Sequence, residues 1–311
     1  MKKRFLITGV SGLMGRCLVE YLDKKICEIY GLDRKLVLFN DSENVDNFIQ
    51  CDLNNTSDVA SFIRDIRPDF ICHLAACIKH CKNEIEYYNS NLLGTNSLFE
   101  SIIRANVKPK ILVIGSSAEY GFNNEKYVDE SCPLNPITHY GISKVSEFFL
   151  SNMYRNKYGL PIIYLRVFNH VAPSQDSGLM CSFYAKEVAA IEKKQKDPTL
   201  IVRNPNHIRD IVDTRDVVRS IDMFALSRIE DGEYNICSGK GVSVMDVVKY
   251  LKKISLSEVS IKVDNSISAN STDILFQIGD FSKARLAVDW TPKISLDETL
   301  LDILNYWREN I

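Results

Sequence analysis

The feature that most restricts the fold of this chain is a glycine-rich run near its start. The run T-G-V-S-G-L-M-G, residues 8–15, follows the apolar residues 5–7 and opens an amphipathic segment that extends to Leu22. This order indicates a strand, a tight turn and a helix. The first glycine makes the turn, the second lets the backbone approach a pyrophosphate, and the third lets helix and strand pack closely. Phosphates then bind the free N–H groups of the helix N-terminus, so we predict a dinucleotide site at Gly9, Gly12, Leu13, Met14 and Gly15.

Charged residues at the ends of the next two predicted strands bear on which dinucleotide binds. Asp33 ends a predicted strand over residues 26–33, where its carboxylate can accept the adenosine ribose hydroxyls, which favours NAD. Arg34 could instead meet a 2′-phosphate, which favours NADP, or stand as a solvated loop charge, and the motif does not decide. Asp52 and Leu53 end the following predicted strand, where an adenine could lie, although a carboxylate at a helix start explains Asp52 nearly as well.

Short apolar runs alternate with helical patterns over residues 4–115. Such alternation predicts a parallel sheet with helices on both faces and right-handed crossovers. The expected fold class is therefore α/β, a Rossmann-type doubly wound parallel sheet with a smaller C-terminal α/β substrate lobe. Residues 1–165 should form the dinucleotide-binding domain, joined by some later strands, and residues 166–311 mainly the substrate lobe. Ligands should bind beyond the carboxyl ends of the strands.

The patterns and caps also assign individual elements. Strands are expected at residues 47–52, 70–74 and 110–115. Helices are expected at residues 56–66, with Thr56 or Ser57 as the cap, and over residues 84–105 and 138–158. The end of strand 70–74 and the small residues after it suit close passage beside a cofactor, which adds three expected contacts: Leu74, Ala75 and Ala76.

Composition and charge argue against several other classes of protein. With a net charge of −2, the chain has no basic field for nucleic acid. The basic residues 2–4 precede only three apolar residues before the glycine turn, so we expect no signal peptide and no membrane span, and we predict a cytoplasmic protein. The nine cysteines are odd in number and scattered, which predicts reduced thiols.

One stretch looks at first like a metal site. Residues 72–81 contain three cysteines and two histidines. They include no C-x-x-C pair, and Cys72 and His73 fall in a predicted buried strand. We therefore expect no bound metal.

A second informative region begins where strand 110–115 ends. Ser116 and Ser117 lie just beyond it, on the side of the sheet where ligands should bind. Tyr140 and Lys144 follow near the start of a predicted helix and, four residues apart, share one of its faces. A lysine there, with a nearby oxidised nicotinamide, stabilises a phenolate, so Tyr140 can exchange a proton near neutral pH. Ser117 can donate a hydrogen bond to the same substrate oxygen.

In this order, the motifs resemble those of the extended short-chain dehydrogenase/reductase family. The resemblance rests on T-G-x-x-G-x-x-G, on H-L-A-A at residues 73–76, on S-S-A-E-Y-G at residues 116–121 and on Y-x-x-x-K, and it runs along essentially the whole chain. Within this family the chain is similar to the nucleotide-sugar epimerases, dehydratases and reductases. The stretch N-S-N-L-L-G-T-N, residues 89–96, resembles the family's V-N-x-x-G-T helix, and L-R-V-F-N-H, residues 165–170, resembles its L-R-x-x-N segment.

The resemblance implies a role for each site residue. Tyr140 would donate or accept the proton, Lys144 would hold the nicotinamide ribose, and Ser117 would polarise the sugar oxygen, with Ser116 as the alternative. NADP or NAD would be the cofactor, its reduced form the hydride donor, and Asn91 would join the cofactor site. A nucleotide-diphosphate sugar would be the substrate, with its diphosphate held by Asn169 and by Arg209, a residue type suited to bidentate phosphate recognition.

The C-terminal half resembles one branch of the family in particular. Its stretches R-D-I-V-D-T-R-D-V-V, residues 209–218, and Y-N-I-C-S-G-K-G-V-S, residues 234–243, are similar to the branch that contains GDP-4-keto-6-deoxymannose reductases. Two positions depart from that branch. Ala172 replaces a usual glycine, and residues 270–273 read N-S-T-D where R-P-x-D is expected. An expected phosphate-binding arginine is therefore missing, which leaves the nucleotide and the sugar open.

Three reactions share this framework. We predict a reductase that transfers hydride from NAD(P)H to the C4 ketone of a nucleotide-diphosphate 4-keto-6-deoxy sugar, GDP-linked, for surface-glycan biosynthesis. An NAD-dependent C4-epimerase would use the same residues. A 4,6-dehydratase would also need a base for the C5 proton, and Glu119 stands where dehydratases of the family carry a glutamate, although a hydrogen-bonding role at the turn explains it too.

Other readings of the same residues also stay open. A non-catalytic dinucleotide-sensing protein would normally lack Tyr140 or Lys144, and both are present. His139 and His170 could serve as acids, although a polar loop position explains each of them. The resemblance implies a homodimer formed by helices 84–105 and 138–158, yet amphipathic helices also bury faces inside monomers.

Overall fold

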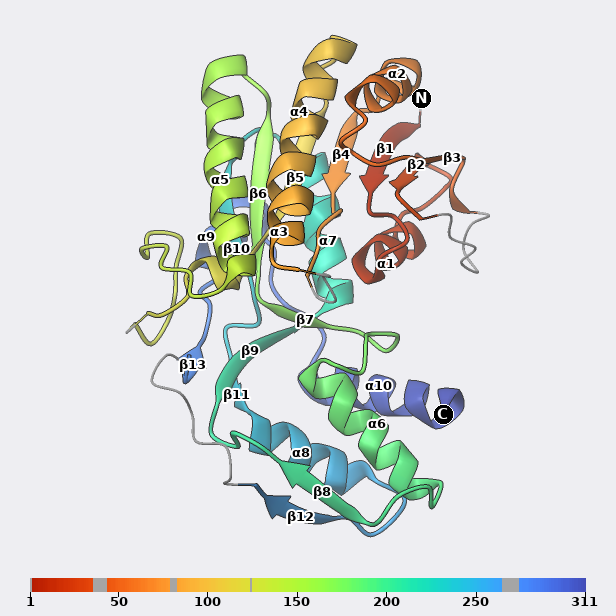
Figure 1. Ribbon diagram of the computed structural model, residues 1–311, viewed down its shortest axis with the longest axis vertical. Coiled ribbons are helices and arrows are strands. Elements are labelled where there is room, and N and C mark those ends of the chain that lie inside the picture. The colour runs from red at the N-terminus through yellow and green to blue at the C-terminus, as the bar shows by residue number, and fades with distance from the viewer. Residues whose placement is uncertain (1, 36–43, 79–82, 124, 265–273) are drawn as a thin grey trace.

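The centre of the molecule is a seven-stranded parallel sheet, seen in the upper part of Figure 1. The computed structural model describes residues 2–35, 44–78, 83–123, 125–264 and 274–311. The strand order β10-β6-β5-β4-β1-β2-β3 reverses direction between β1 and β4, which is where ligands bind in open α/β sheets. The predicted Rossmann-type doubly wound sheet is therefore confirmed. Its strands are β1 Lys3–Thr8, β2 Cys27–Asp33, β3 Asn47–Gln50, β4 Phe70–His73, β5 Lys110–Ser116, β6 Ile162–Val167 and β10 Gly232–Ile236.

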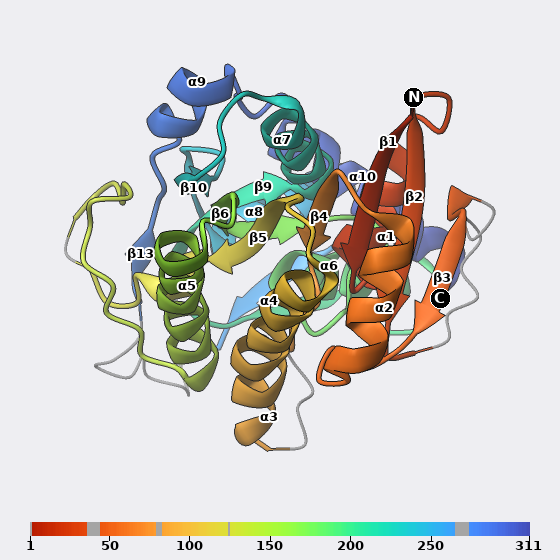
Figure 2. The same ribbon diagram turned by 90° about the horizontal axis from the view of Figure 1, so that it is seen from above.

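Helices cover both faces of this sheet, as Figure 2 shows from above. Successive side chains of a strand point to opposite faces, so in β1 Phe5 and Ile7 pack in one apolar cluster and Leu6 in another. The first cluster includes α1 Leu13–Tyr21 and α7 Thr214–Leu226. The second includes three helices: α2 Thr56–Ile66, α4 Gly94–Ala105 and α5 His139–Tyr158. Burial on both faces explains why the central strands are continuous apolar runs.

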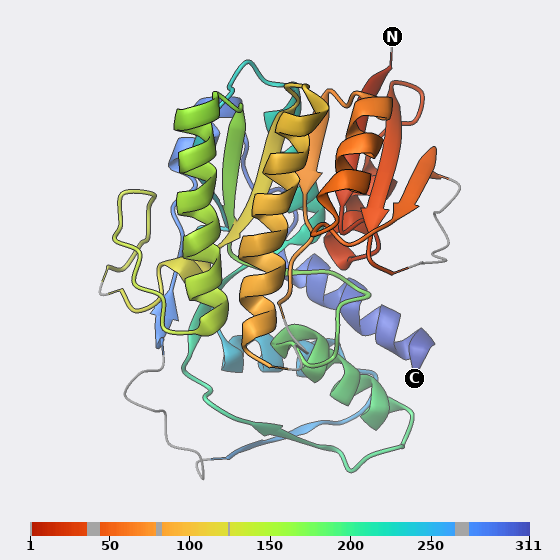
Figure 3. The ribbon, with the colours of Figure 1, turned by 45° about the horizontal axis from the view of Figure 1, so that its top comes forward.

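A smaller lobe lies below the sheet in Figures 1 and 3. Its main sheet places β9 between β11 and β13, with β7 also paired to β9. A separate parallel pair consists of β8 and β12. The apolar faces of α6, α8 and α10 pack together with β8 in one core. The bounds of these elements are β7 Asn169–Val171, β8 Thr199–Val202, β9 Ile208–Asp213, β11 Gly241–Ser243, β12 Ser260–Val263, β13 Phe276–Gln277, α6 Met180–Glu192, α8 Val244–Ile254, α9 Ser282–Val288 and α10 Leu296–Asn310.

Two predicted helices differ in detail from the observed ones. Asn55 caps α2 by accepting a hydrogen bond from the Asp58 N–H, so the predicted cap at Thr56 or Ser57 is wrong by one or two residues. The predicted helix 84–105 is a helical stretch of three parts. It contains α3 Ile85–Tyr87, a π-helical segment Tyr88–Leu93 and α4. A π-helical segment inside an α-helix frequently marks a functional site.

Two further observations concern membranes and cysteines. None of the helices in the described part of the chain is long and apolar enough to span a membrane. A cytoplasmic location stays a prediction from the sequence. Seven of the described cysteines are free thiols, but Cys77 is disulfide-bonded, so the prediction of reduced thiols is wrong at that position.

Candidate active site

The glycine-rich turn has a geometry that requires glycine. Gly9 has a φ of +69°, in the left-handed region, and a Cβ there would lie 2.7 Å from Ala75 Cα. A Cβ on Gly15 would lie 2.5 Å from the Gly9 carbonyl oxygen. Backbone atoms cannot give way as a flexible side chain can, so glycine is needed at both positions. The turn thereby brings the end of β1, the start of α1 and the segment after β4 together.

The first helix begins at the wall of a large cavity. Its N-terminal cap, Gly12, offers no side-chain hydrogen bond to the first N–H groups of α1. The cavity has a volume of about 700 Å³ and is lined by all five predicted residues of the glycine run, together with Leu74 and Ala76. Uncapped N–H groups at the positive end of a helix dipole suit a phosphate. These residues therefore fit the pyrophosphate of a dinucleotide.

The residues predicted to contact the ribose lie next to this turn. Asp33, at the end of β2, accepts hydrogen bonds through Oδ2 from Ser11 N at 3.2 Å and Ser11 Oγ at 2.5 Å. Arg34 Nη1 lies 3.9 Å from Asp52 Oδ2, and both of these side chains are exposed. Asp52 Oδ1 also accepts a hydrogen bond from Asn54 N, in the turn before α2. Both an acceptor for ribose hydroxyls and a cation for a 2′-phosphate are thus present at this edge.

Three other predicted cofactor residues make structural contacts and do not line the cavity. Leu53 is buried in the core that α2 and α4 share. The Ala75 backbone packs against the glycine turn. Asn91 lies in the π-helical segment, where its Oδ1 accepts from Cys77 N at 2.7 Å and its Nδ2 donates to Ser143 Oγ at 3.0 Å. Asn91 therefore links the segment after β4 to helix α5.

Helix α5 carries the predicted Tyr140 and Lys144, and both line the cavity. Lys144 Nζ donates a hydrogen bond to the Ile114 carbonyl oxygen at 2.8 Å. Tyr140 keeps partial exposure because it borders the cavity. Burial raises the pKa of Tyr140, whereas the Lys144 ammonium and a hydrogen bond with the Ser116 side chain oppose that rise. A phenol held beside an ammonium and a hydroxyl is suited to proton exchange with a bound substrate.

The structure distinguishes the two adjacent serines, which the sequence left open. Ser116, the last residue of β5, contacts Tyr140. Ser117 is 6% exposed, and its backbone carbonyl oxygen accepts a hydrogen bond from Gln277 Nε2 at 2.9 Å. Both serines border the cavity, but it is the Ser116 side chain that helps to lower the pKa of Tyr140.

Glu119 does not reach the cavity. It is fully buried, and its Oε2 accepts a hydrogen bond from Arg166 Nε at 2.8 Å. Its Oε1 accepts from Ser116 N at 2.7 Å and from the Tyr164 hydroxyl at 3.0 Å. Burial raises the pKa of Glu119, and the Arg166 guanidinium opposes that rise. This placement matches the local turn role and does not support the expected role as a catalytic base.

The predicted substrate residues lie on neighbouring strands of the smaller lobe. Asn169 is on β7 and Arg209 on β9, the two strands are paired, and both side chains line the cavity. Asn169 Nδ2 donates to the Asp210 carbonyl oxygen at 3.0 Å. The cavity therefore extends from the glycine turn of the first lobe to an amide and a guanidinium in the second. The segment with the missing arginine, residues 270–273, lies outside the described residues.

Neither histidine that we considered as an acid has the required properties. His170 lines the cavity, but burial lowers its pKa to about 4, so it is neutral at pH 7 and holds Thr214 at 3.0 Å. His139 starts α5 outside the cavity lining and pairs with Glu84 Oε2 at 2.9 Å. Both positions therefore match the polar structural role.

Sequence reasoning missed several polar residues of the cavity wall. Gln175 is nearly buried, and its Nε2 donates to the His170 carbonyl oxygen at 2.8 Å. Its Oε1 has no hydrogen-bond partner in the described part of the chain. His207 and Gln277 line the wall as well. A polar residue shortly after the L-R-V-F-N-H stretch was a usable signal for Gln175. No local signal marked Gln277, which lies 160 positions from the serine that it contacts.

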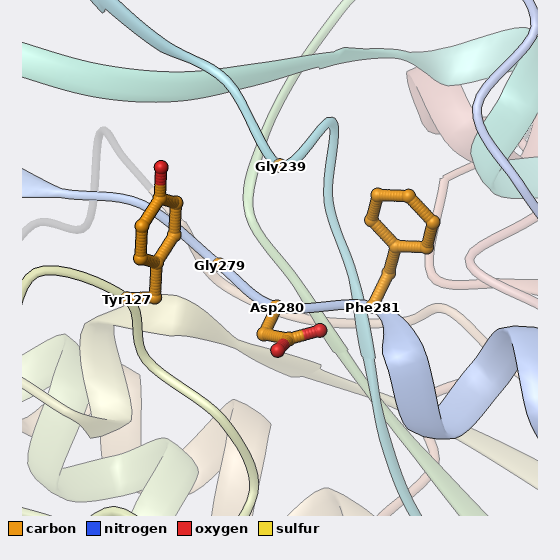
Figure 4. A pocket seen from close by; sticks show the side chains of 5 residues that line it. All are labelled: Tyr127, Gly239, Gly279, Asp280 and Phe281. Carbon is orange, nitrogen blue, oxygen red and sulfur yellow. The ribbon is translucent and has the colours of Figure 1, made fainter.

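Two other places in the molecule do not belong to this site. Among the described residues, no three His, Cys, Asp or Glu side chains gather as metal ligands, and His80 and Cys81 lie outside those residues. A smaller hollow of about 260 Å³ lies beside the start of α9 (Figure 4), where Asp280 Oδ1 accepts from Ser282 N. It is lined by Tyr127, Gly239, Gly279, Asp280 and Phe281, none of which was predicted as a site residue.

Comparison with known proteins finds that the chain is similar to dehydratases and to a dehydrogenase. A family model described as GDP-mannose 4,6 dehydratase matches residues 6–303. A GDP-6-deoxy-D-talose 4-dehydrogenase from Aggregatibacter actinomycetemcomitans is 31% identical over 283 residues, which cover 90% of this chain and 89% of the relative. A GDP-mannose 4,6-dehydratase from Yersinia enterocolitica is 25% identical over 350 aligned positions, which cover 97% and 93%.

Solved structures share the fold along the whole chain. A putative epimerase from Burkholderia cenocepacia superposes with a TM-score of 0.87 at 23% identity, covering 99% of this chain and 98% of that one. RMD from Pseudomonas aeruginosa, complexed with NADPH, has a TM-score of 0.86 at 22% identity and covers 100% of both chains. A UDP-glucose 4-epimerase from Thermotoga maritima, with UDP-glucose, has a TM-score of 0.85 at 24% identity and covers 99% of both. These likenesses show the fold.

Proposed function

Because this chain belongs to the GDP-mannose 4,6 dehydratase family of extended short-chain dehydrogenases/reductases, we propose that it transfers hydride at C4 of a nucleotide-diphosphate sugar. The proposed substrate is a GDP-linked 4-keto-6-deoxy sugar, and the proposed direction is reduction of its ketone. The relative named a GDP-6-deoxy-D-talose 4-dehydrogenase supports both the nucleotide and the carbon atom. Oxidation and reduction at C4 are the two directions of one reaction.

One observation carries this proposal: the cavity that begins at the glycine turn also contains Tyr140, Lys144 and Ser116. These groups suffice for hydride transfer coupled to proton transfer. A 4,6-dehydratase also needs a base for the C5 proton, and Glu119 is buried against Arg166 instead. Among the described lining residues, Asp176 carries the one carboxylate, and its Oδ1 is held by Gly178 N at 2.6 Å. This arrangement favours the reductase over the dehydratase.

The chain's own residues provide the proton and the orientation. When bound, the reduced nicotinamide supplies the hydride that C4 accepts. Tyr140 donates its phenolic proton to the ketone oxygen, which becomes the new hydroxyl, and Ser116 donates a hydrogen bond to the same oxygen. Lys144 stabilises the resulting phenolate by its positive charge. The phenolate regains a proton from solvent before the next turnover.

The cofactor that we propose is NADP or NAD. The glycine turn and the uncapped start of α1 fit its pyrophosphate, and Asp33 lies beside that turn. RMD from Pseudomonas aeruginosa is complexed with NADPH, which supports the same class of cofactor. Arg34 is the group that a 2′-phosphate would meet, so R34A should weaken NADPH binding more than NADH binding if NADP is the natural cofactor.

The second lobe supplies the groups that we propose for the sugar nucleotide. Arg209 and Asn169 would hold the diphosphate. Gln175 Oε1, an acceptor without a partner among the described residues, would accept a hydrogen bond from a substrate hydroxyl or N–H. These contacts lie on the cavity wall beyond the reaction centre.

A nucleotide-sugar C4-epimerase is the second candidate, since the same three residues would serve it. The Thermotoga maritima relative is named a UDP-glucose 4-epimerase. An epimerase would interconvert two sugars without net oxidation of the cofactor. A reductase consumes one NAD(P)H for each sugar reduced.

The test is direct incubation of the purified protein with GDP-4-keto-6-deoxymannose and either NADPH or NADH, followed at 340 nm and by product analysis. We expect stoichiometric oxidation of the cofactor. Parallel reactions use a UDP-linked 4-keto-6-deoxy sugar, UDP-glucose and GDP-mannose. Epimerised UDP-glucose without cofactor loss, or dehydrated GDP-mannose, would show that the reductase assignment is wrong.

Substitution of Tyr140 separates an enzyme from a dinucleotide-sensing protein. Y140F removes one hydroxyl and should lower kcat by about 10²- to 10⁴-fold, the usual contribution of a positioned general acid. Dinucleotide affinity should persist, because the glycine turn is untouched. Turnover at the wild-type rate in Y140F would remove the catalytic basis of this proposal.

We also propose a homodimer built on α5 and the neighbouring helical stretch. Ile142, Phe149 and Met153 of α5 are 41%, 60% and 40% exposed, and Leu93 nearby is 50% exposed. The two helical elements lie side by side on one face of the sheet (Figures 1 and 2). An exposed apolar patch of this kind marks a protein–protein contact. Light scattering should give the mass of a dimer for the wild type and of a monomer for F149E; a monomeric wild type would contradict the proposal.

A further inference from the structure

Lys144 belongs to a buried ion pair that the reaction scheme does not use. Its Nζ lies 2.7 Å from Glu147 Oε2, and the two side chains are 3% and 1% exposed. The only other acceptor recorded for this ammonium in the described part of the chain is the Ile114 carbonyl oxygen at 2.8 Å. An ammonium has three N–H donors, so these two contacts fix its direction and leave one donor for the cavity, which Lys144 lines.

The Glu147 carboxylate is itself held in place from the opposite side. Its Oε1 accepts a hydrogen bond from Thr95 Oγ1 at 2.9 Å. Thr95 Oγ1 lies 2.8 Å from His73 Nε2, and His73 Nδ1 lies 2.8 Å from Thr8 Oγ1. A chain of buried hydrogen bonds thus joins Lys144 to the residue that precedes the glycine turn.

The proton positions in this chain follow from its acceptors. Thr95 has one hydroxyl proton but faces two acceptors, Glu147 Oε1 and the Asn91 carbonyl oxygen at 2.6 Å. Thr95 Oγ1 therefore accepts a hydrogen bond from the N–H at His73 Nε2, and His73 Nδ1 accepts a hydrogen bond from Thr8 Oγ1. Burial, aided by Lys144, lowers the pKa of His73 to about 3, so the ring is neutral and adds no competing charge.

The charges around the pair leave Glu147 as the counter-ion of Lys144. The titratable groups that face the pair are Tyr140 on α5, His73 on β4, Tyr164 on β6 and Glu119 after β5. Glu119 is already paired with a guanidinium at 2.8 Å. Burial opposes the Lys144 charge, but Glu147 first, then Tyr140 and Glu119, raise the pKa of Lys144 above its usual value.

We propose that Glu147 is a positioning residue, which holds the Lys144 ammonium charged and aimed at Tyr140 through the chain Thr8–His73–Thr95–Glu147. This inference rests on the proposed chemistry of Tyr140 and Lys144. Glu147 does not line the cavity, so it acts on the reaction through Lys144 alone. It contributes no proton to the substrate.

The isosteric variant E147Q tests the charge. Removal of a negative charge lets the coupled Tyr140–Lys144 pair lose its first proton at lower pH, whichever side chain releases it. The alkaline limb of the reductive kcat/KM profile should therefore move down by about one to three pH units, the range for a close opposite charge. E147D, which keeps the charge, should recover most of the wild-type profile.

A second measurement makes the test independent of the substrate. In protein labelled at the lysine ε-carbon, NMR titration follows the Lys144 resonance, which is assigned by its absence in K144M. We expect this resonance to titrate at lower pH in E147Q than in the wild type. If the wild type reduces no sugar nucleotide but this titration moves, the proposed function fails and the assignment of Glu147 stands.

E100Q is the matched control. Glu100, on α4, accepts a hydrogen bond from the Tyr154 hydroxyl at 2.5 Å and does not contact Lys144. It should change neither the pH profile nor the Lys144 titration. If E147Q lowers only thermal stability, with both pH readouts as in the wild type, Glu147 is a structural residue and the inference is wrong.

Discussion

Two buried ion pairs lie close together beside the proposed reaction centre, and they differ in whether one of their side chains lines the cavity. Lys144–Glu147, at 2.7 Å, includes a side chain that lines the cavity. Arg166–Glu119, at 2.8 Å, includes none. The Tyr164 hydroxyl lies between them, 3.0 Å from Glu119 Oε1 and 3.4 Å from Glu147 Oε2. A buried carboxylate near the proposed catalytic tyrosine is therefore not by itself a catalytic group, because its effect depends on where its partner points.

The surroundings of the two cations explain this difference. The Arg166 guanidinium lies 4.3 Å from the centre of the Phe148 ring and 5.2 Å from that of Tyr120. Its Nη1 also donates to the Tyr120 hydroxyl at 3.3 Å. Aromatic rings thus enclose Arg166, and cation–π contacts add to its ion pair. Neither of these cation–π contacts involves Lys144, whose ammonium keeps one N–H donor for the cavity.

The largest expected effect comes from breaking the Arg166–Glu119 pair, whose guanidinium the aromatic rings enclose. E119Q leaves the Arg166 charge buried without a counter-ion and should lower the free energy of unfolding by about 3–5 kcal/mol. Urea unfolding of E119Q and wild type measures this loss. The alkaline limb of the kcat/KM profile should move down by less than in E147Q, because Glu147 raises the pKa of Lys144 more than Glu119 does.

The opposite result would erase the contrast between the pairs. If E119Q keeps wild-type stability but moves the pH profile as far as E147Q does, Glu119 acts on the chemistry and the dehydratase role of this residue returns. F148L gives a smaller change at the same site. It removes one ring from Arg166 and should cost stability without any effect on the pH profile.

The same contrast explains which parts of the site the sequence could predict. Tyr140 and Lys144 share a helix face through local periodicity, and Glu147 lies only one turn further along, so its pairing with Lys144 had a local signal that we did not use. The Arg166–Glu119 contact joins residues 47 positions apart and depends on the register of β5 against β6. No local pattern contains that register.

Other differences between prediction and structure have equally local causes. Asn54, Asn55, Thr56 and Ser57 can all cap a helix, so the start of α2 was uncertain by a residue or two. In the smaller lobe, β7, β11 and β13 have only two or three residues each, which carry no periodic signal. Strands β1 to β5 of the main sheet, by contrast, were predicted closely, since turn residues flank them, whereas β6 and β10 were not assigned from the sequence.

The next largest effect distinguishes the adjacent serines at the end of β5. S116A removes the hydroxyl beside Tyr140 and should lower kcat by about 10²-fold, as does loss of one donor to a developing charge. S117A is the matched control. Its carbonyl contact with Gln277 does not need the side chain, so kcat should change little. A larger loss in S117A than in S116A would restore the serine that the sequence favoured.

The smallest expected effect is on the stability of the fold at acid pH. It tests whether the surroundings of the Lys144–Glu147 pair differ from those of the Arg166–Glu119 pair. His73 belongs to the chain that holds Glu147, whereas no described histidine bonds to Glu119 or Arg166. Burial lowers the pKa of His73 to about 3 and that of His170, which belongs to neither pair, to about 4. An unfolded histidine titrates near 6.5, so below that pH the unfolded chain binds protons that the folded chain does not.

Stability should therefore fall as the pH drops from about 6.5, by about 1.4 kcal/mol per pH unit for each of these histidines, until each folded pKa is reached. H73Q and H170Q should each flatten the slope between pH 6 and pH 5 by that amount, as measured by urea unfolding at fixed ionic strength. The double variant should flatten it by the sum, because the two rings share no partner. An unchanged slope in H73Q would mean that His73 is protonated in the folded protein. The chain from Thr8 to Glu147 would then carry a positive charge close to Lys144, which would weaken the contrast between the two pairs.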